Sequence, residues 1–264
     1  MSSSQSADET AVITGASRGI GYELAKQFAA DGYDMVLIAR SEEQLQTVGK
    51  ELETTHGINT SVIVSDLSAS DAANTVYERI QSQTRVIDVL VNNAGFGIYG
   101  EFVDTKLSEE MNLIHLHILT VTKLTKLIAR DMVTRNHGYI LNTASTAGFA
   151  PLPKSAVYSA AKHYQRSFSE ALAEELADEG VTVTALCPGE TDTGFMSRGN
   201  YEETGFKKEE LMDPTTVAQA GYDGLMNKER IVIPGIKHKI RTFLRRILPR
   251  KTYVKAAGNS LEQR

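Results

Sequence analysis

Short runs of β-branched and other apolar residues alternate with longer segments of helical periodicity along almost the whole chain. The runs that predict strands cover residues 11–14, 35–39, 60–65, 86–92, 139–143, 181–187 and 230–233. The segments that predict helices cover residues 20–31, 42–55, 71–82, 108–135, 155–179 and 214–226. A strand, a helix and a second strand in succession form a right-handed crossover, which makes the two strands parallel. The alternation therefore predicts a doubly wound α/β fold with a seven-stranded parallel sheet and helices on both faces.

The chain is expected to form one domain over residues 10–264, because no linker-like stretch or internal repeat divides it. Residues 1–9 are mostly polar and predict a short disordered tail. Two segments do not fit the alternation. Residues 194–213 mix apolar and polar side chains and are expected to form a mobile lid over a substrate. Residues 236–264 form a basic C-terminal extension.

The composition argues against several classes of protein. The net charge of −5 disfavours a general nucleic-acid binder, and a single cysteine excludes a disulfide framework. No apolar run approaches the roughly 18 residues that a membrane span needs, and the start of the chain has no signal-peptide pattern. His115 and His117 are two residues apart on a helix, unlike a pair of metal ligands. We therefore expect a cytoplasmic protein without a metal site.

Glycines gather between the first predicted strand and the first predicted helix. They permit a tight turn and a close approach of the backbone to phosphate, and the helix N-terminus behind them offers unpaired N–H groups. The turn therefore predicts a binding site for the pyrophosphate of a dinucleotide. The residues expected to contact it are Gly15, Ser17, Arg18, Gly19, Ile20 and Gly21.

The end of the second predicted strand bears on which dinucleotide binds. A site for NAD(H) places an acidic residue there to bind the ribose 2′-hydroxyl, whereas this chain has Ala39 followed by Arg40. Together with Arg18, Arg40 could bind a 2′-phosphate through charge-assisted hydrogen bonds. This pattern predicts NADP(H) rather than NAD(H); the alternative is that both arginines are solvated surface charges.

Three residues later in the chain are candidates for proton transfer. Tyr158 and Lys162 are four residues apart and lie on one face of a predicted helix. A free phenol has a pKa of about 10, and a neighbouring cation is expected to lower it toward neutrality. Ser145 follows the fifth predicted strand, and its hydroxyl could hydrogen-bond a substrate oxygen as negative charge develops there. The set predicts acid–base chemistry on a carbon–oxygen group.

Taken together, the Gly-x-x-x-Gly-x-Gly spacing, Ser145, the Tyr-x-x-x-Lys pair and the segment Asn92-Asn93-Ala94-Gly95 resemble the short-chain dehydrogenase/reductase family, in its short single-domain branch. The resemblance implies a Rossmann-type fold and a role for Lys162 in holding the nicotinamide ribose. Further cofactor contacts that it implies are Asp66 and Leu67 at the adenine, Asn93 in the cleft, and Pro188, Gly189, Thr191 and Thr193 at the nicotinamide carboxamide. Asp66 has an alternative role as a helix N-cap.

The chain departs from the family's pattern in the helix after the fourth strand. The family usually has an asparagine there, which completes a proton relay by holding water near the lysine. The alignment places His117 at this position. An imidazole can both donate and accept a hydrogen bond, so His117 is a candidate for the relay. The alternative is a histidine satisfied within the core.

The resemblance implies hydride transfer between nicotinamide C4 and a carbon that bears oxygen. We expect an NADP(H)-dependent ketone or aldehyde reductase, and the alternative is a non-catalytic NADP(H)-binding sensor or scaffold on the same fold. Apolar side chains in the segments at the strands' carboxyl ends predict a small-molecule carbonyl substrate of apolar character. These are Phe96, Ile98, Tyr99, Phe149, Leu152, Phe195 and Met196.

The C-terminal extension carries eight basic residues and no acidic residue between positions 237 and 255, which leaves −13 on the rest of the chain. Apolar residues recur in it at helical spacing, which predicts a basic amphipathic helix. Packing on the same chain or on another subunit is the favoured interpretation over contact with an anionic membrane. The resemblance also implies a homodimer or a homotetramer, formed through the two long helices.

Overall fold

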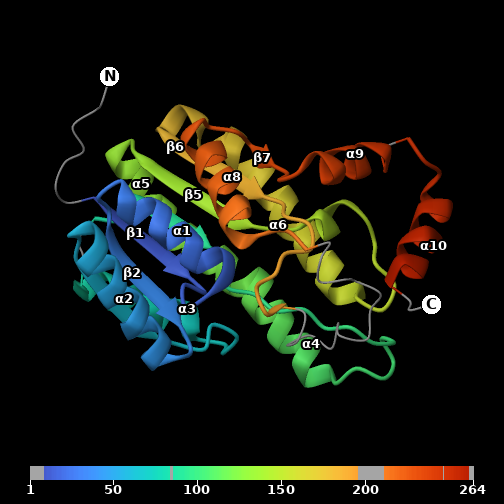
Figure 1. Cartoon of the computed structure of the whole chain (residues 1–264), viewed down its shortest axis with the longest axis horizontal. Coiled ribbons are helices and arrows are strands. Elements are labelled where there is room, and N and C mark those ends of the chain that lie inside the picture. Colours follow the sequence, from blue (N-terminus) through green and yellow to red (C-terminus); the bar gives the residue numbers. More distant parts are fainter. Residues whose placement is uncertain (1–8, 84–85, 196–210, 246, 262–264) are drawn as a thin grey trace.

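The sheet has seven strands, all parallel, in the order β3-β2-β1-β4-β5-β6-β7 (Figure 1), as predicted. The computed structural model describes residues 9–83, 86–195, 211–245 and 247–261. The strands are β1 (Thr10–Thr14), β2 (Asp34–Ala39), β3 (Thr60–Val64), β4 (Val89–Asn92), β5 (Gly138–Thr143), β6 (Val181–Leu186) and β7 (Ile231–Val232). The predicted tail, apart from Glu9, and residues 196–210 of the predicted lid lie outside the described residues.

Helices cover both faces of the sheet because successive side chains of each buried strand point to opposite faces. Ile13 of β1 packs in one apolar cluster and its neighbour Val12 packs in the other. The first face is covered by α1 (Gly19–Ala30), α2 (Glu42–His56) and α8 (Pro214–Met226). The second is covered by α3 (Ala72–Gln83), α5 (Val121–Arg135) and α6 (Ala156–Glu175). Two separate cores therefore hold the sheet in place.

The structure corrects two of the predicted helices. The single helix expected over 108–135 is α4 (Leu107–Ile114), a π-helical segment η1 (His115–Thr120), and then α5. A π-helical turn carries an extra residue and so changes the direction in which its side chains point. The helix expected over 155–179 is α6 followed, after Leu176, by the short 3₁₀ segment η3 (Ala177–Glu179). Periodicity alone does not reveal either irregularity.

The C-terminal extension forms two helices, α9 (Ile236–Leu244) and α10 (Arg250–Leu261). Figure 1 shows them beside the sheet, on the same side as the C-terminus. No helix among the described residues is long enough and apolar enough to cross a lipid bilayer.

The strand order reverses between β1 and β4, which are neighbours in the sheet although β2 and β3 lie between them along the chain. Ligands bind at such switch points, outside the carboxyl ends of the strands. The two strand ends are tied together here, because the Asn93 backbone N–H donates to Thr14 Oγ1 over 2.9 Å and the Asn93 Nδ2 donates to the Thr14 carbonyl over 3.1 Å. Gly15, the first glycine of the predicted phosphate-binding turn, directly follows β1.

Candidate active site

A cavity of about 530 Å³ opens at the carboxyl ends of the strands, within the size range of small-molecule sites. Most of the residues predicted for the site line it. They are Gly15, Ser17, Arg18, Ile20, Arg40, Asp66, Leu67, Asn93, Ser145, Tyr158, Lys162, Pro188, Gly189, Thr191 and Thr193. Gly19, Gly21 and His117 are not part of the wall. The fold therefore brings segments from the two halves of the chain to one cleft.

The glycine turn is packed so closely that side chains would not fit. A Cβ on Gly21 would lie 2.3 Å from the Gly15 carbonyl oxygen and 2.4 Å from Asn93 Nδ2. Gly19 has a φ of +59°, and a Cβ there would lie 2.8 Å from Thr193 Cβ. Arg18 precedes α1 and makes no side-chain hydrogen bond to its first turn, which leaves those N–H groups to a ligand. This cradle fits the pyrophosphate of a nicotinamide dinucleotide.

The two arginines predicted to bind a 2′-phosphate point to different places. Arg40 lies near Asp66, whereas the Arg18 guanidinium lies against Gly194. Burial alone would raise the pKa of Asp66, but hydrogen bonds from Ser68 and the charge of Arg40 lower it below its ordinary value. Asp66 accepts from the Ser68 hydroxyl over 2.7 Å and the Ser68 N–H over 3.0 Å. It therefore orders the loop before α3 rather than capping that helix.

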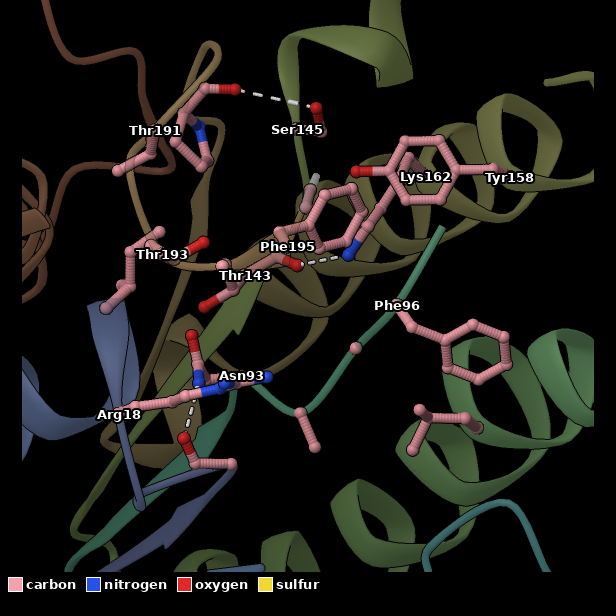
Figure 2. Close-up of a pocket in the computed structure, with 18 of the residues that line it drawn as sticks. Arg18, Asn93, Phe96, Thr143, Ser145, Tyr158, Lys162, Thr191, Thr193 and Phe195 are labelled. Atoms are coloured by element: carbon pink, nitrogen blue, oxygen red, sulfur yellow. Dashed lines mark hydrogen bonds between the residues drawn. The ribbon is translucent and has the colours of Figure 1, made fainter. Parts of the chain in front are cut away.

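Ser145, Tyr158 and Lys162 meet on one wall of the cavity, as Figure 2 shows. Ser145 follows β5 and begins the short 3₁₀ segment η2 (Thr146–Phe149), where its Oγ accepts from the Ala147 N–H over 3.1 Å. Tyr158 and Lys162 project from α6, and Lys162 Nζ lies 5.8 Å from the centre of the Tyr158 ring. The four-residue spacing thus places both side chains in the same cleft, as predicted.

The electrostatics of this wall differ from the expectation for the phenol. Burial raises the pKa of Tyr158 to about 12; a hydrogen bond with Ser145 acts in the opposite direction, and the charge of Glu190 adds to the rise. The neighbouring Lys162 does not offset this rise. Its Nζ donates to the Thr143 carbonyl over 2.7 Å and to Gln165 Oε1 over 2.8 Å. Burial also lowers the pKa of Lys162 to about 7. Tyr158 is therefore a neutral phenol at neutral pH in this arrangement.

His117 lies fully buried behind the wall, in the π-helical segment. Its ring packs edge-on against Tyr158, with 5.9 Å between ring centres, and a Cβ on Gly95 would lie 2.7 Å from His117 Cε1. Burial, and then the charge of Lys162, lower the pKa of His117 well below its ordinary value. The ring is therefore neutral, and its Nε2 lies 2.8 Å from the Phe96 carbonyl oxygen. Nδ1 is buried without a hydrogen-bond partner among the described residues.

Several polar residues at the site were not predicted from the sequence. Gln165 is almost fully buried one turn after Lys162 and holds its ammonium. The sequence carried a signal for Gln165, since it is a polar residue on the inner face of the predicted helix. Glu190, Arg241 and Arg245 also line the cavity, and the two arginines reach it from the C-terminal extension.

Three of the apolar residues predicted for the pocket line the cavity among the described residues. Phe96, Leu152 and Phe195 line the cavity, and the Phe195 ring lies 5.6 Å from that of Tyr158. Ile98 instead packs in a small buried cluster, and Phe149 packs under the Arg166 guanidinium. Tyr99 is not among the lining residues, and Met196 lies outside the described part of the chain. An apolar ligand group would therefore lie between Phe96, Leu152 and Phe195.

Comparison with known proteins agrees with this geometry. A model of the short chain dehydrogenase family matches residues 9–204. The chain is 34% identical over 223 residues to 17-beta-hydroxysteroid dehydrogenase type 3 of Mus musculus, a match that covers 82% of this chain and 72% of the relative. It is 37% identical over 184 residues to very-long-chain 3-oxoacyl-CoA reductase of Anas platyrhynchos, covering 67% of this chain and 58% of that one.

Solved structures give the same result. A short-chain dehydrogenase from Sphingobium yanoikuyae in complex with NADPH superposes with a TM-score of 0.79 at 29% identity, covering 91% of this chain and 96% of that one. The bulky-bulky ketone specific alcohol dehydrogenase from Comamonas testosteroni has a TM-score of 0.77 at 28% identity, with 92% and 96% covered. On the sequence match, the sheet order and the arrangement of the cleft, the chain belongs to the short-chain dehydrogenase family.

Proposed function

We propose that the protein is an NADP(H)-dependent oxidoreductase that reduces the carbonyl group of an apolar ketone or aldehyde. The observation that carries this proposal is the meeting of Ser145, Tyr158 and Lys162 on one wall of a cavity whose other end is the glycine cradle. The non-catalytic alternative gains no support, because a binding protein does not need these three side chains together. Relatives whose names describe carbonyl or alcohol substrates support the proposal further.

Each of the three residues has a distinct role in the proposed reaction. A bound NADPH would supply the hydride. Tyr158 is held as a neutral phenol by burial, which is the form that donates a proton to the developing alkoxide. Ser145 lies within hydrogen-bond reach of the same phenol and polarises the carbonyl oxygen. Lys162 is fixed by Thr143 and Gln165, which holds its Nζ near the Tyr158 ring, where it would also bind the nicotinamide ribose of a bound cofactor.

A ketone panel tests the substrate class. The readout is NADPH consumption. We expect hydrophobic ketones to be reduced with higher kcat/KM than small polar ones, because their apolar surface is buried against Phe96, Leu152 and Phe195 on binding. A panel in which only small polar ketones are reduced would contradict the apolar pocket. If the protein bound NADPH but turned over no ketone or aldehyde, the proposal that it is a carbonyl-reducing enzyme would be wrong.

Arg40 is the proposed determinant of NADP(H) preference, since it lines the proposed adenosine end of the cleft and β2 ends in Ala39 rather than in an acid. The Arg40→Asp variant is expected to lose about 10- to 100-fold in kcat/KM for NADPH relative to NADH, because a hydrogen bond to a charged group is worth about 1.5–3 kcal/mol. Lys50→Asp is the control, since it makes the same change of charge on an exposed part of α2. An unchanged ratio in Arg40→Asp would rule out this role.

We also propose that His117 replaces the usual asparagine of the relay. Nε2 lies 2.8 Å from the Phe96 carbonyl oxygen and 3.2 Å from the Phe96 backbone nitrogen, so that Nδ1 is the ring atom left without a partner near Lys162 and Gln165. An unpartnered buried polar atom costs about 1–3 kcal/mol, and a water placed between Nδ1 and Lys162 would remove that cost. The neutral ring would therefore hold this water by a hydrogen bond and orient it toward Lys162, without taking up the proton itself.

Two substitutions separate the relay from a packing role. His117→Leu is expected to lower kcat at least tenfold and to change the pH profile of kcat. This is a smaller effect than the roughly 10²–10⁴-fold rate contribution of a general acid, because His117 is a relay residue. His117→Asn should restore most of the activity, because an amide also donates and accepts. If His117→Leu folds with an unchanged melting temperature and keeps both kcat and its pH profile, His117 is only a core residue.

A further inference from the structure

The outer face of α9 and of the turn that follows it carries a row of large apolar side chains in contact with solvent. The members of the row recur at spacings of three and four residues, and each is between 46 and 69% exposed. They are Ile236, Ile240, Phe243, Leu244, Ile247 and Leu248. A single exposed apolar residue is ordinary, but a contiguous group marks a contact surface. We call these six residues the apolar row.

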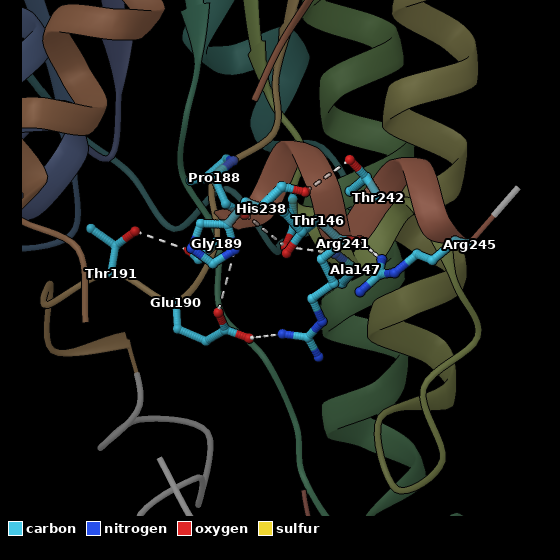
Figure 3. Close-up of polar contacts among 11 residues, drawn as sticks. Thr146, Ala147, Pro188, Gly189, Glu190, Thr191, His238, Arg241, Thr242 and Arg245 are labelled. Atoms are coloured by element: carbon cyan, nitrogen blue, oxygen red, sulfur yellow. Dashed lines mark hydrogen bonds and ion pairs between the residues drawn. The ribbon is translucent and has the colours of Figure 1, made fainter. Parts of the chain in front are cut away.

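The opposite face of α9 is polar and is already occupied by the protein itself (Figure 3). Arg241 Nη1 lies 3.5 Å from Glu190 Oε1, and His238 Nδ1 lies 3.9 Å from Glu190 Oε2. Arg245 donates to the Thr146 carbonyl. A Cβ on Gly189 would lie 2.1 Å from the His238 ring, so that the helix is seated closely on the Pro-Gly segment.

This orientation changes the interpretation of the C-terminal extension. A surface helix normally turns its apolar face to its own protein and its charged face to water. In α9 the polar face is turned inward, since Thr242 is buried while Phe243 beside it is exposed. The sequence favoured packing on the same chain or on another subunit; packing on the same chain accounts for the polar face of α9 and leaves the apolar row uncovered.

Cations surround the apolar row. Lys237 and Lys239 are exposed on its two flanks, and Arg250, Lys251 and Lys255 are exposed on α10. No acidic residue lies between positions 237 and 255, whereas the rest of the chain sums to −13. A second copy of this surface docked on the first would bring lysine against lysine. A membrane that contains anionic lipids instead offers acyl chains to the apolar row and headgroup phosphates to the lysines.

We propose that α9 and the turn after it dock the protein on an anionic lipid membrane, with the apolar row in the interface and Lys237 and Lys239 at the headgroups. The docking does not depend on the proposed reaction. It places the active-site cavity beside the lipid surface, because Arg241 and Arg245 of the same segment line that cavity.

Sedimentation of the full chain with lipid vesicles tests the proposal. We expect it to sediment with vesicles of phosphatidylcholine and phosphatidylserine, much less with phosphatidylcholine alone, and less as salt rises. The double variant Ile240→Ser/Phe243→Ser should bind the mixed vesicles at least tenfold more weakly. Lys237→Gln/Lys239→Gln should bind about 25-fold more weakly, at about fivefold for each lysine near the surface.

A matched control removes apolar surface elsewhere. Leu107→Ser/Met111→Ser changes two exposed side chains of α4 and should leave vesicle binding unchanged. Because all of these positions are exposed, the melting temperature of each variant should stay close to that of the parent. The proposal is overturned if the parent chain does not bind mixed vesicles, or if Ile240→Ser/Phe243→Ser binds them equally well. It is also overturned if that variant only converts a dimer into a monomer, since the row would then join two copies.

Discussion

Replacing Tyr158 by phenylalanine is expected to lower kcat by about 10³-fold while NADPH still binds, because the change removes only the hydroxyl that donates the proton. The ring remains to pack against His117 and Phe195, so the fold should be kept. The measurements are steady-state turnover of a hydrophobic ketone and NADPH binding followed by fluorescence. The dissociation constant for NADPH should change by less than about threefold, since an aromatic ring still stands at the same place.

Tyr164→Phe is the matched control on the same helix. Its hydroxyl lies 2.6 Å from the Thr122 hydroxyl and its ring stacks on Phe168, and it does not line the cavity. It should keep nearly full activity. Turnover retained in Tyr158→Phe would remove the acid–base assignment, and loss of NADPH binding together with turnover would show that Tyr158 acts in binding instead.

The second large effect is expected in the glycine turn, where Gly21→Ala should weaken NADPH binding by about a hundredfold or more. In an ordinary helix this substitution would stabilise the protein by about 0.5–1 kcal/mol. At Gly21 the new Cβ would lie 2.3 Å from the Gly15 carbonyl oxygen, so the turn must move away from α1. A displacement of about 1 Å in a site is enough for an effect of about a hundredfold.

Gly32→Ala separates this effect from the general cost of a glycine substitution. Gly32 has a φ of +87°, and no atom lies within 4 Å of the Cβ position. Alanine there should cost about 1–2 kcal/mol of stability, through backbone strain alone, and leave NADPH binding unchanged. Calorimetric melting and fluorescence titration of both variants measure the two effects separately. Normal NADPH binding by Gly21→Ala would contradict the close packing of the turn.

Much of this protein could be predicted because its signals are local. The alternation of strands and helices predicted the parallel sheet, since a buried strand between two helices has few other ways to pack. The spacing of Tyr158 and Lys162 predicted a shared face, because four residues make about one helical turn. The two side chains do line one cleft.

Other features depend on residues that are distant in the sequence. The pKa of Tyr158 was expected to fall because Lys162 is near, but the lysine is held by the Thr143 carbonyl of β5 and by Gln165, and burial decides the direction. Arg18 and Arg40 were predicted to bind one 2′-phosphate; both line the cavity, with the Arg18 guanidinium against Gly194 and Arg40 near Asp66. Sequence spacing gives no information on such orientations, because they depend on which neighbours the fold supplies.

The amino-acid order by itself determined the sheet, the glycine turn and the helix that carries Tyr158 and Lys162, since each depends on backbone propensity and on contacts within a few residues. Tertiary structure alone decided which face of α9 meets the protein. The amphipathic pattern of α9 was visible in the sequence, but the pattern does not say which face is buried. Glu190 and Thr146 decide this, because they contact the polar face. Those two residues hold the polar face, and the apolar row is left outward by the geometry of a helix.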